Sequence, residues 1–236
     1  MRRSGTLVLC TLGVGDVLLA QPLLAALREG LDGRLVVLAR AGSPAQLARR
    51  LGIADLVVDY VARWPHRVKG GLTLSPWIAH QHFSLVLTTT GLNPYYSGLM
   101  ALASNAPDRV SERRGHMTWA WTHVVDVQTG THTVDRNRSL GQAVGVTAGT
   151  VPRMSPSPAE MDRARLLLGD HDVCIAVTPG SNKTIAHKRW PLDKFAALIV
   201  RLRTAGAHVV VLGGPDEGDM GRQLTGMTGT NGITEL

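Results

Sequence analysis

The sequence predicts an α/β protein with two domains, each built around a parallel sheet, and three observations lead to this prediction. Short apolar runs alternate with segments of helical periodicity, which is the pattern of repeated βαβ units. The apolar runs are continuous rather than alternating with polar residues, as expected for strands that are covered on both faces. The alternation stops near residues 151–158 and then begins again, which divides the chain into two parts.

The first domain is expected to span residues 1–150. An apolar, β-rich run at 6–11 predicts its first strand, and the segment 16–29 predicts a helix because its leucines recur at helical spacing. A stretch rich in Trp, Pro and His after residue 60 is expected to be a loop. The remaining elements continue the alternation, with strands at 34–39, 55–59 and 84–88 and helices at 44–51 and 95–103.

A proline- and serine-rich segment, 151–158, cannot form a helix interior or a central strand and predicts a linker. With the helix expected at 159–168 it fills residues 151–170. The second domain, 171–236, then carries strands at 173–178 and 208–212 and helices at 192–204 and 216–224. Two strands are few for a sheet that is covered on both faces, so we expect this domain to be incomplete in the chain.

Composition narrows the class of protein. The net charge is +7, but the basic residues are dispersed and aromatic residues make up only 4%, which argues against a nucleic-acid partner. A basic surface equally suits a phosphorylated substrate or an anionic membrane face. Cys10 and Cys174 lie in apolar runs without metal-ligand spacing, so both are predicted to be buried thiols of a reduced protein.

The start of the chain does not resemble a signal peptide, because two glycines and Asp16 interrupt its apolar stretch. No segment is apolar over the length of a bilayer. We therefore expect a cytoplasmic protein, whose basic surface allows peripheral contact with the inner face of the membrane.

A glycine-rich turn, 11–16, joins the first predicted strand to the first helix and ends at Asp16. Glycines such as Gly15 allow the main chain to approach a ligand closely at a helix N-terminus. Asp16 has two interpretations: a helix cap, or a general base at the carboxyl end of a parallel strand. An NAD-dependent oxidoreductase is disfavoured because Leu18 replaces the third glycine of the dinucleotide fingerprint and Arg40 stands near the second strand's end, where an acid is expected.

Three further polar residues, His132, Arg136 and Asn137, occupy neighbouring parts of one face at the start of a predicted helix. They are candidates for a ligand cleft. The structural alternative is that His132 caps the helix and Arg136 pairs with a nearby carboxylate.

The second domain contains a candidate diphosphate site. Residues 179–183 are small and polar, residues 187–189 are basic, and Pro191 marks the start of the next helix. A solvated basic loop with Trp190 packed on the core is the alternative. Glu217 follows the next predicted strand, where an acid can accept hydrogen bonds from a ribose or simply stabilise the start of a helix.

These segments, in this order, resemble glycosyltransferase family 9, the ADP-heptose:lipopolysaccharide heptosyltransferases. The resemblance covers almost the whole chain and is carried by five motifs, at residues 12–18, 83–87, 132–137, 188–196 and 211–215. It implies a GT-B-type architecture of two Rossmann-like domains, with the acceptor bound by the first and the nucleotide sugar by the second. It also implies an inverting transfer without a metal or other cofactor, from a donor such as ADP-heptose to a cell-surface glycan or glycolipid.

The resemblance assigns roles to individual residues. Asp16 matches the proposed general base, Lys188 the lysine at the donor phosphates, Ser181 the small hydroxyl loop beside them, and Glu217 the acid at the ribose. The family's later Asp-Ser/Thr-Gly-Pro-x-His segment has no counterpart, so this chain is expected to bind the donor weakly. The alternative to a glycosyltransferase is a non-catalytic α/β module that binds a phosphorylated ligand or a glycan.

Overall fold

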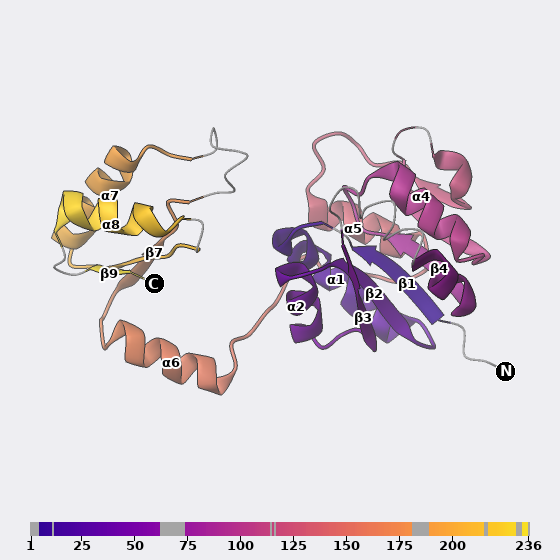
Figure 1. Cartoon of the computed structure of the whole chain (residues 1–236), viewed down its shortest axis with the longest axis horizontal. Coiled ribbons are helices and arrows are strands. Elements are labelled where there is room, and N and C mark those ends of the chain that lie inside the picture. The colour runs from indigo at the N-terminus through magenta and orange to yellow at the C-terminus, as the bar shows by residue number, and fades with distance from the viewer. Residues whose placement is uncertain are drawn as a thin grey trace. The chain divides into compact units, whose positions relative to one another are not determined.

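The computed structural model describes residues 5–10, 12–61, 74–113, 115, 117–180, 189–214, 217–229 and 233–235. The chain divides into two compact units, Met1–Met154 and Ser155–Leu236 (Figure 1). The division falls inside the proline- and serine-rich segment, where few contacts can form because prolines prevent regular pairing. Each unit has its own parallel sheet and is described by itself.

The first unit contains a six-stranded sheet in the order β3-β2-β1-β4-β5-β6, and every pair of neighbouring strands is parallel. Strands β1 and β4 lie side by side at the centre. The chain continues from β1 to β2 and β3 on one side and from β4 to β5 and β6 on the other, so the connections that follow β1 and β4 diverge. The strands are β1 (Gly5–Cys10), β2 (Leu35–Arg40), β3 (Leu56–Tyr60), β4 (Phe83–Thr88), β5 (Asp108–Glu112) and β6 (His123–Val125).

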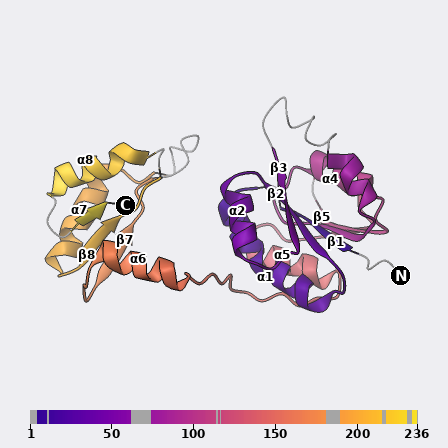
Figure 2. The same ribbon diagram turned by 60° about the horizontal axis from the view of Figure 1, so that its bottom comes forward.

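Helices cover both faces of this sheet (Figure 2). Alternate residues of β1 belong to two separate apolar clusters, because successive side chains of a strand point to opposite faces. One cluster joins β1 to α1 (Val14–Gly30), α2 (Ser43–Arg50) and α5 (Thr133–Gln142). The other joins it to a helical segment at 74–80, α4 (Pro94–Ala103) and the 3-10 helix η1 (Thr118–Ala120).

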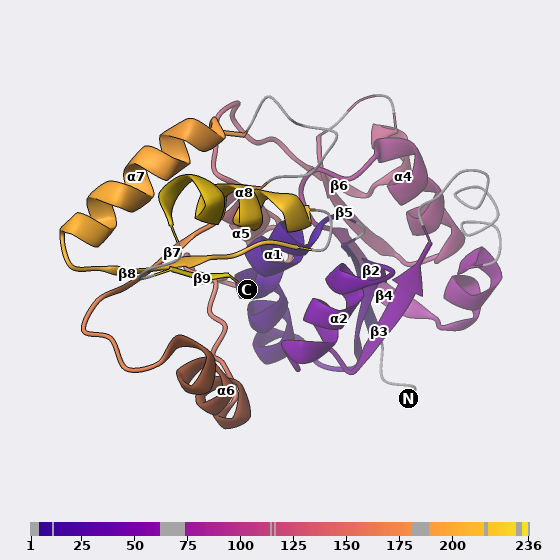
Figure 3. The same cartoon turned by 60° about the vertical axis from the view of Figure 1, so that its left-hand side comes forward.

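The second unit contains a three-stranded parallel sheet in the order β7-β8-β9. Figure 3 shows α7 and α8 on one side of these strands, where a small apolar cluster includes Ile199 and Val209, both with 0% exposure. Helix α6 begins with a capping box of Ser157 and Glu160 and buries none of its residues. The elements are α6 (Pro158–Leu168), β7 (Cys174–Val177), α7 (Leu192–Thr204), β8 (His208–Val211), α8 (Gly218–Thr228) and β9 (Ile233–Glu235).

Several elements differ from the sequence-based expectation. Strands β5, β6 and β9 were not expected, and residues 74–80 form a helix inside the stretch expected to be a loop. Cys10 is buried as predicted, but the prediction for Cys174 was wrong, because this thiol is exposed. It lies on edge strand β7, where Ile175 and Val177 face the apolar cluster and strand alternation turns Cys174 to the other face.

Among the described residues, no helix combines the length and the apolar character needed to cross a membrane.

Candidate active site

The carboxyl edge of the first sheet, where β1 and β4 lie side by side, is the candidate site of the first unit. Helix α1 leaves β1 toward one face, whereas α4 leaves β4 toward the other. Ligands of open α/β sheets bind where the connections diverge in this way, at the carboxyl ends of the strands. The first turn of α1 and the loop 89–93 border this position.

Asp16 is the third residue of α1, and the cap of this helix is Gly13 rather than Asp16. The Gly13 N–H donates to Asp16 Oδ2 over 2.9 Å. No other hydrogen bond to this half-buried carboxylate comes from the described residues, so Oδ1 keeps its full capacity to accept. The prediction that Asp16 is the helix cap was therefore wrong: Asp16 stabilises the helix start from the third helical position, by accepting from the cap residue, and retains an oxygen that can serve a substrate.

The residues around Asp16 set the chemistry of this edge. A Cβ added to exposed Gly15 would meet no atom within 4 Å, so packing among the described residues does not require a glycine there. Burial raises the pKa of the Cys10 thiol to about 12, an effect partly offset by a hydrogen bond with Thr89 and increased by the charge of Asp16. Cys10 is therefore a protonated core thiol near neutral pH and not a nucleophile.

The three candidates on α5 have structural partners. His132 is the cap of α5, and its Nδ1 accepts a hydrogen bond from the Val134 N–H over 3.3 Å. Arg136 forms an ion pair with Glu112, whose side chain is only 8% exposed, at the carboxyl end of β5. Both structural alternatives for these two residues are thus confirmed.

Asn137 connects three segments at the same edge. Its side-chain oxygen accepts from the Thr90 N–H over 3.1 Å, and its side-chain nitrogen donates to the Leu19 carbonyl over 3.2 Å. The residue is 2% exposed, so these bonds satisfy groups that water does not reach. Asn137 holds the loop after β4 against α1, the helix that carries Asp16.

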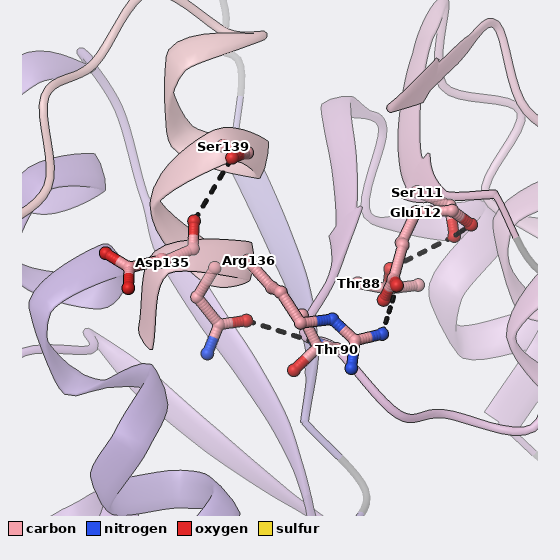
Figure 4. A network of polar contacts seen from close by, with 8 residues as sticks. Thr88, Thr90, Ser111, Glu112, Asp135, Arg136 and Ser139 are labelled. Carbon is pink, nitrogen blue, oxygen red and sulfur yellow. Dashed lines mark hydrogen bonds and ion pairs between the residues drawn. The ribbon is translucent and has the colours of Figure 1, made fainter. Parts of the chain in front are cut away.

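A polar network continues from α5 into the sheet (Figure 4). The Thr88 hydroxyl donates to Ser111 Oγ over 3.2 Å, and the Ser111 hydroxyl donates to the Glu112 carbonyl over 3.1 Å. The Nε–H of Arg136 is buried and has no acceptor among the described residues. The adjoining cavity measures only about 10 Å³ and holds at most about one water, so a sugar cannot enter here.

In the second unit, Glu217 links the turns that follow β7 and β8. Its Oε2 accepts from the Gly214 N–H over 3.0 Å, and its carboxylate lies directly against Gly180. A Cβ added to Gly180 would lie 1.9 Å from Glu217 Cδ, so only glycine fits beside this carboxylate as it stands. The Pro-Gly pair in the sequence signals a tight turn, but its contact with Glu217 could not be inferred from the chain.

The predicted phosphate-binding residues Ser181 and Lys188 lie outside the described residues. At the end of that segment, Trp190 is 49% exposed and packs edge-on against Phe195, with ring centroids 5.0 Å apart. The expected packing of Trp190 on the core is therefore only partial. Pro191 is the cap of α7, one position before the first helical turn in which it was expected.

Comparison with protein-family models decides the class of the protein. The model for glycosyltransferase family 9 (heptosyltransferase) matches residues 77–228, which is more than half of the chain. The chain belongs to glycosyltransferase family 9. The resemblance seen in the sequence is thereby confirmed, and glycosyl transfer is the class of reaction that the family performs. No curated protein sequence matches the chain.

Solved structures show the same fold for this family 9 glycosyltransferase. The ADP-heptose lps heptosyltransferase II of E. coli is 19% identical, with a TM-score of 0.76 over 98% of this chain and 72% of that one. A family 9 glycosyl transferase from Veillonella parvula is 18% identical, with a TM-score of 0.77 over 100% and 70%. The E. coli heptosyltransferase WaaC with ADP is 17% identical, with a TM-score of 0.70 over 98% and 74%.

These similarities confirm the predicted GT-B-type α/β fold class for the family 9 chain, and at such identities they concern the fold alone. The roles of Asp16, Ser181, Lys188 and Glu217 stay predictions. Polar residues that the sequence did not single out, Thr88 and Ser111 among them, line the same edge of the first sheet. Their signal in the sequence is weak, because isolated hydroxyl residues are common in strands and loops.

Proposed function

We propose that the protein is an inverting, metal-independent glycosyltransferase that moves a sugar from a nucleotide-diphosphate donor to a bacterial cell-surface glycan or glycolipid. A heptose carried by ADP is the first candidate for the donor, because the two E. coli structures of similar fold are heptosyltransferases and one of them contains ADP. Family membership supports the class of reaction.

Asp16 is the proposed general base. In the proposed reaction its carboxylate takes the proton of an acceptor hydroxyl, and that oxygen forms a bond to the anomeric carbon of the donor. The bond from this carbon to the nucleoside diphosphate breaks on the opposite face, so the configuration inverts. The observation that carries the proposal is Oδ1 of half-buried Asp16, which accepts no hydrogen bond from the described residues and lies at the diverging carboxyl edge of β1 and β4.

The donor is assigned to the second unit. Ser181 and Lys188 are proposed to contact the diphosphate, where a cation and main-chain N–H groups would stabilise the leaving charge. Glu217 is proposed to contact the ribose, since it stands at the turn after β8. No three His, Cys, Asp or Glu side chains are grouped for a metal ion in the described part of the chain, and transfer in the presence of EDTA would test the metal-independent mechanism.

Replacing Asp16 by Asn tests the base. The amide keeps an oxygen for the Gly13 N–H but cannot take a proton. We therefore expect the rate of sugar transfer to fall by about 10²-fold or more relative to the wild-type protein. Donor affinity, measured by titration with ADP, is expected to stay within about twofold, because Asp16 belongs to the acceptor unit.

Asp135 offers a matched control, because it is also the third residue of a helix whose cap precedes it by three positions. Asp135→Asn makes the same chemical change in the first turn of α5 and is expected to leave transfer unchanged. Wild-type turnover by Asp16→Asn would leave Asp16 as a helix-stabilising residue only. A wild-type chain that binds the donor or a glycan but transfers no sugar would instead identify the non-catalytic binding module.

A further inference from the structure

The outer side of α4 is unusual because it carries no charge. The sequence contains no Asp, Glu, Lys or Arg from Phe83 to Pro107, a stretch that includes the whole of this surface helix. Its buried side contributes Met100 and Ala101 to the core, yet Tyr95 is 53% and Leu99 57% exposed. Surface helices normally turn charged or polar residues to solvent, so this helix has two apolar sides.

The 3-10 helix η1 extends the same surface. A Cβ added to Gly98 would lie 2.9 Å from Met117 Cε and 3.3 Å from Ala120 Cβ, which means that the absent side chain of Gly98 lets η1 pack directly on α4. Between these contacts, Trp119 is 67% exposed. Tyr95, Leu99 and Trp119 thus come from two adjoining elements, and we call them the aromatic patch.

The first unit, which carries the aromatic patch, is basic. Residues 1–154 contain 16 Lys and Arg residues and 9 Asp and Glu residues, so the formal net charge of this unit is +7. Arg113 is exposed and pairs with Asp126, whereas nearby Glu112 is buried and pairs with Arg136. The whole chain carries a net charge of +7. An anionic surface is therefore a more favourable partner than a neutral or basic surface of equal size.

We propose that the aromatic patch docks the first unit on an anionic phospholipid surface. Trp and Tyr favour the boundary between lipid headgroups and acyl chains, where their rings are apolar and their polar atoms stay hydrated. Leu99 adds apolar area, and the basic chain adds attraction to anionic headgroups. The inference rests on the proposed function only in that a glycolipid acceptor would be presented at such a surface.

Vesicle sedimentation tests the proposal without donor or acceptor, so its outcome is independent of transfer. The wild-type chain is mixed with vesicles of phosphatidylcholine alone and of phosphatidylcholine with phosphatidylglycerol. We expect stronger binding to the anionic vesicles, with at least about a tenfold loss for Trp119→Ser and for Leu99→Ser, since each removes a large apolar side chain from the lipid contact. Trp119→Phe is expected to retain most of the binding.

Val151→Ser is the matched control, because Val151 is 64% exposed in the same unit but lies outside the aromatic patch. It is expected to bind like the wild type.

Wild-type binding by both Trp119→Ser and Leu99→Ser, or no binding of the wild-type chain to anionic vesicles, would overturn the proposal. So would a dimer in light scattering that Trp119→Ser dissociates, because the patch would then be a contact between two copies of the chain. If Asp16→Asn kept full activity while these vesicle results held, the proposed base would fall and the docking surface would stand.

Discussion

Asn137 is the residue that best shows how a polar side chain can fix a site without touching a substrate. Replacing it by Leu leaves the buried Thr90 N–H without its acceptor, whereas the Leu19 carbonyl keeps its place in helix α1. A stranded buried N–H costs about 1–3 kcal/mol, so the free energy of unfolding of the first unit should fall by about that amount. Urea denaturation followed by circular dichroism measures the change.

Asn93→Leu supplies the comparison for this prediction. Asn93 is the exposed cap of α4 and accepts from the Tyr95 and Tyr96 N–H groups, so its loss costs only about 1 kcal/mol. Equal effects of the two replacements would mean that Asn137 acts merely as another local cap. A larger effect at Asn137 would confirm its role across segments.

A second prediction at this scale concerns pH and His208. Its ring stacks on that of His171 at 3.8 Å, and partial burial, followed by the charge of His171, lowers the pKa of His208. The unfolded chain therefore protonates His208 below about pH 6.5, whereas the folded chain does so only at a lower pH. As the pH falls through this range, protons stabilise the unfolded chain and the stability of the fold is lost. Melting curves at about pH 7.5 and pH 5.5 should show this loss.

His208→Asn should reduce the difference between the two pH values, because the imidazole that resists protonation is gone. His123→Asn, at the exposed position of β6 in the first unit, provides the control and should leave the difference unchanged. If His208→Asn keeps the full pH dependence, another group is responsible for it.

At the scale of elements, the turns after β7 and β8 are coupled through Gly180 and Glu217. Gly180→Ala would push the Glu217 carboxylate aside and break its bond with the Gly214 N–H, at a cost of about 1 kcal/mol. In a Glu217→Ala background the same replacement should cost little, since the carboxylate that it meets is absent. A double-mutant cycle measured by chemical denaturation gives the coupling energy.

Gly226→Ala is the control for this cycle. Gly226 lies inside α8, where an added Cβ meets open space, so Ala should raise the stability by about 1 kcal/mol instead of lowering it. Additive effects of Gly180→Ala and Glu217→Ala would show that the two turns do not constrain each other.

Some strands of the fold can be predicted from the sequence, whereas others cannot. Strands β1, β2, β4 and β8 were predictable because they are continuous apolar runs that lie inside or near the centre of their sheets. Strand β5, with the sequence DRVSE, was missed because its buried Ser111 and Glu112 are stabilised by partners from distant segments, Thr88 and Arg136. Hydrophobic periodicity cannot reveal a strand whose polar residues are satisfied only in the folded chain.

The candidate site was predictable to the extent that it follows from local connections. Asp16 stands directly after the first strand and its helix start can be read from the glycines, so its place at the sheet edge follows from topology. The bonds of Asn137 and the contact of Glu217 with Gly180 join residues far apart in sequence. Such contacts depend on the packing of the whole unit, and a single sequence does not contain them.

For the whole molecule, the two units have separate apolar cores of different size. Among the residues that the structure describes, the second core contains six buried residues, far fewer than the two clusters of the first unit. Because small cores supply less stabilisation, the second unit should unfold at a lower temperature, giving two transitions in calorimetry. Ile199→Ala should lower the temperature of only the first transition, and Leu23→Ala that of only the second. Each replacement should reduce the free energy of unfolding of its own unit by about 2–5 kcal/mol. A single transition that both replacements shift equally would contradict this independence.

The bonds of Asn137 also bear on how the sheet edge that carries Asp16 can change over time. Both of its partners are main-chain atoms, the Thr90 N–H and the Leu19 carbonyl. The side chains of this loop and of the first turns of α1 can therefore be exchanged without loosening the scaffold that holds them. For the proposed glycosyl transfer, this arrangement allows new acceptor specificities to be engineered at the loop positions while the anchoring amide stays the same.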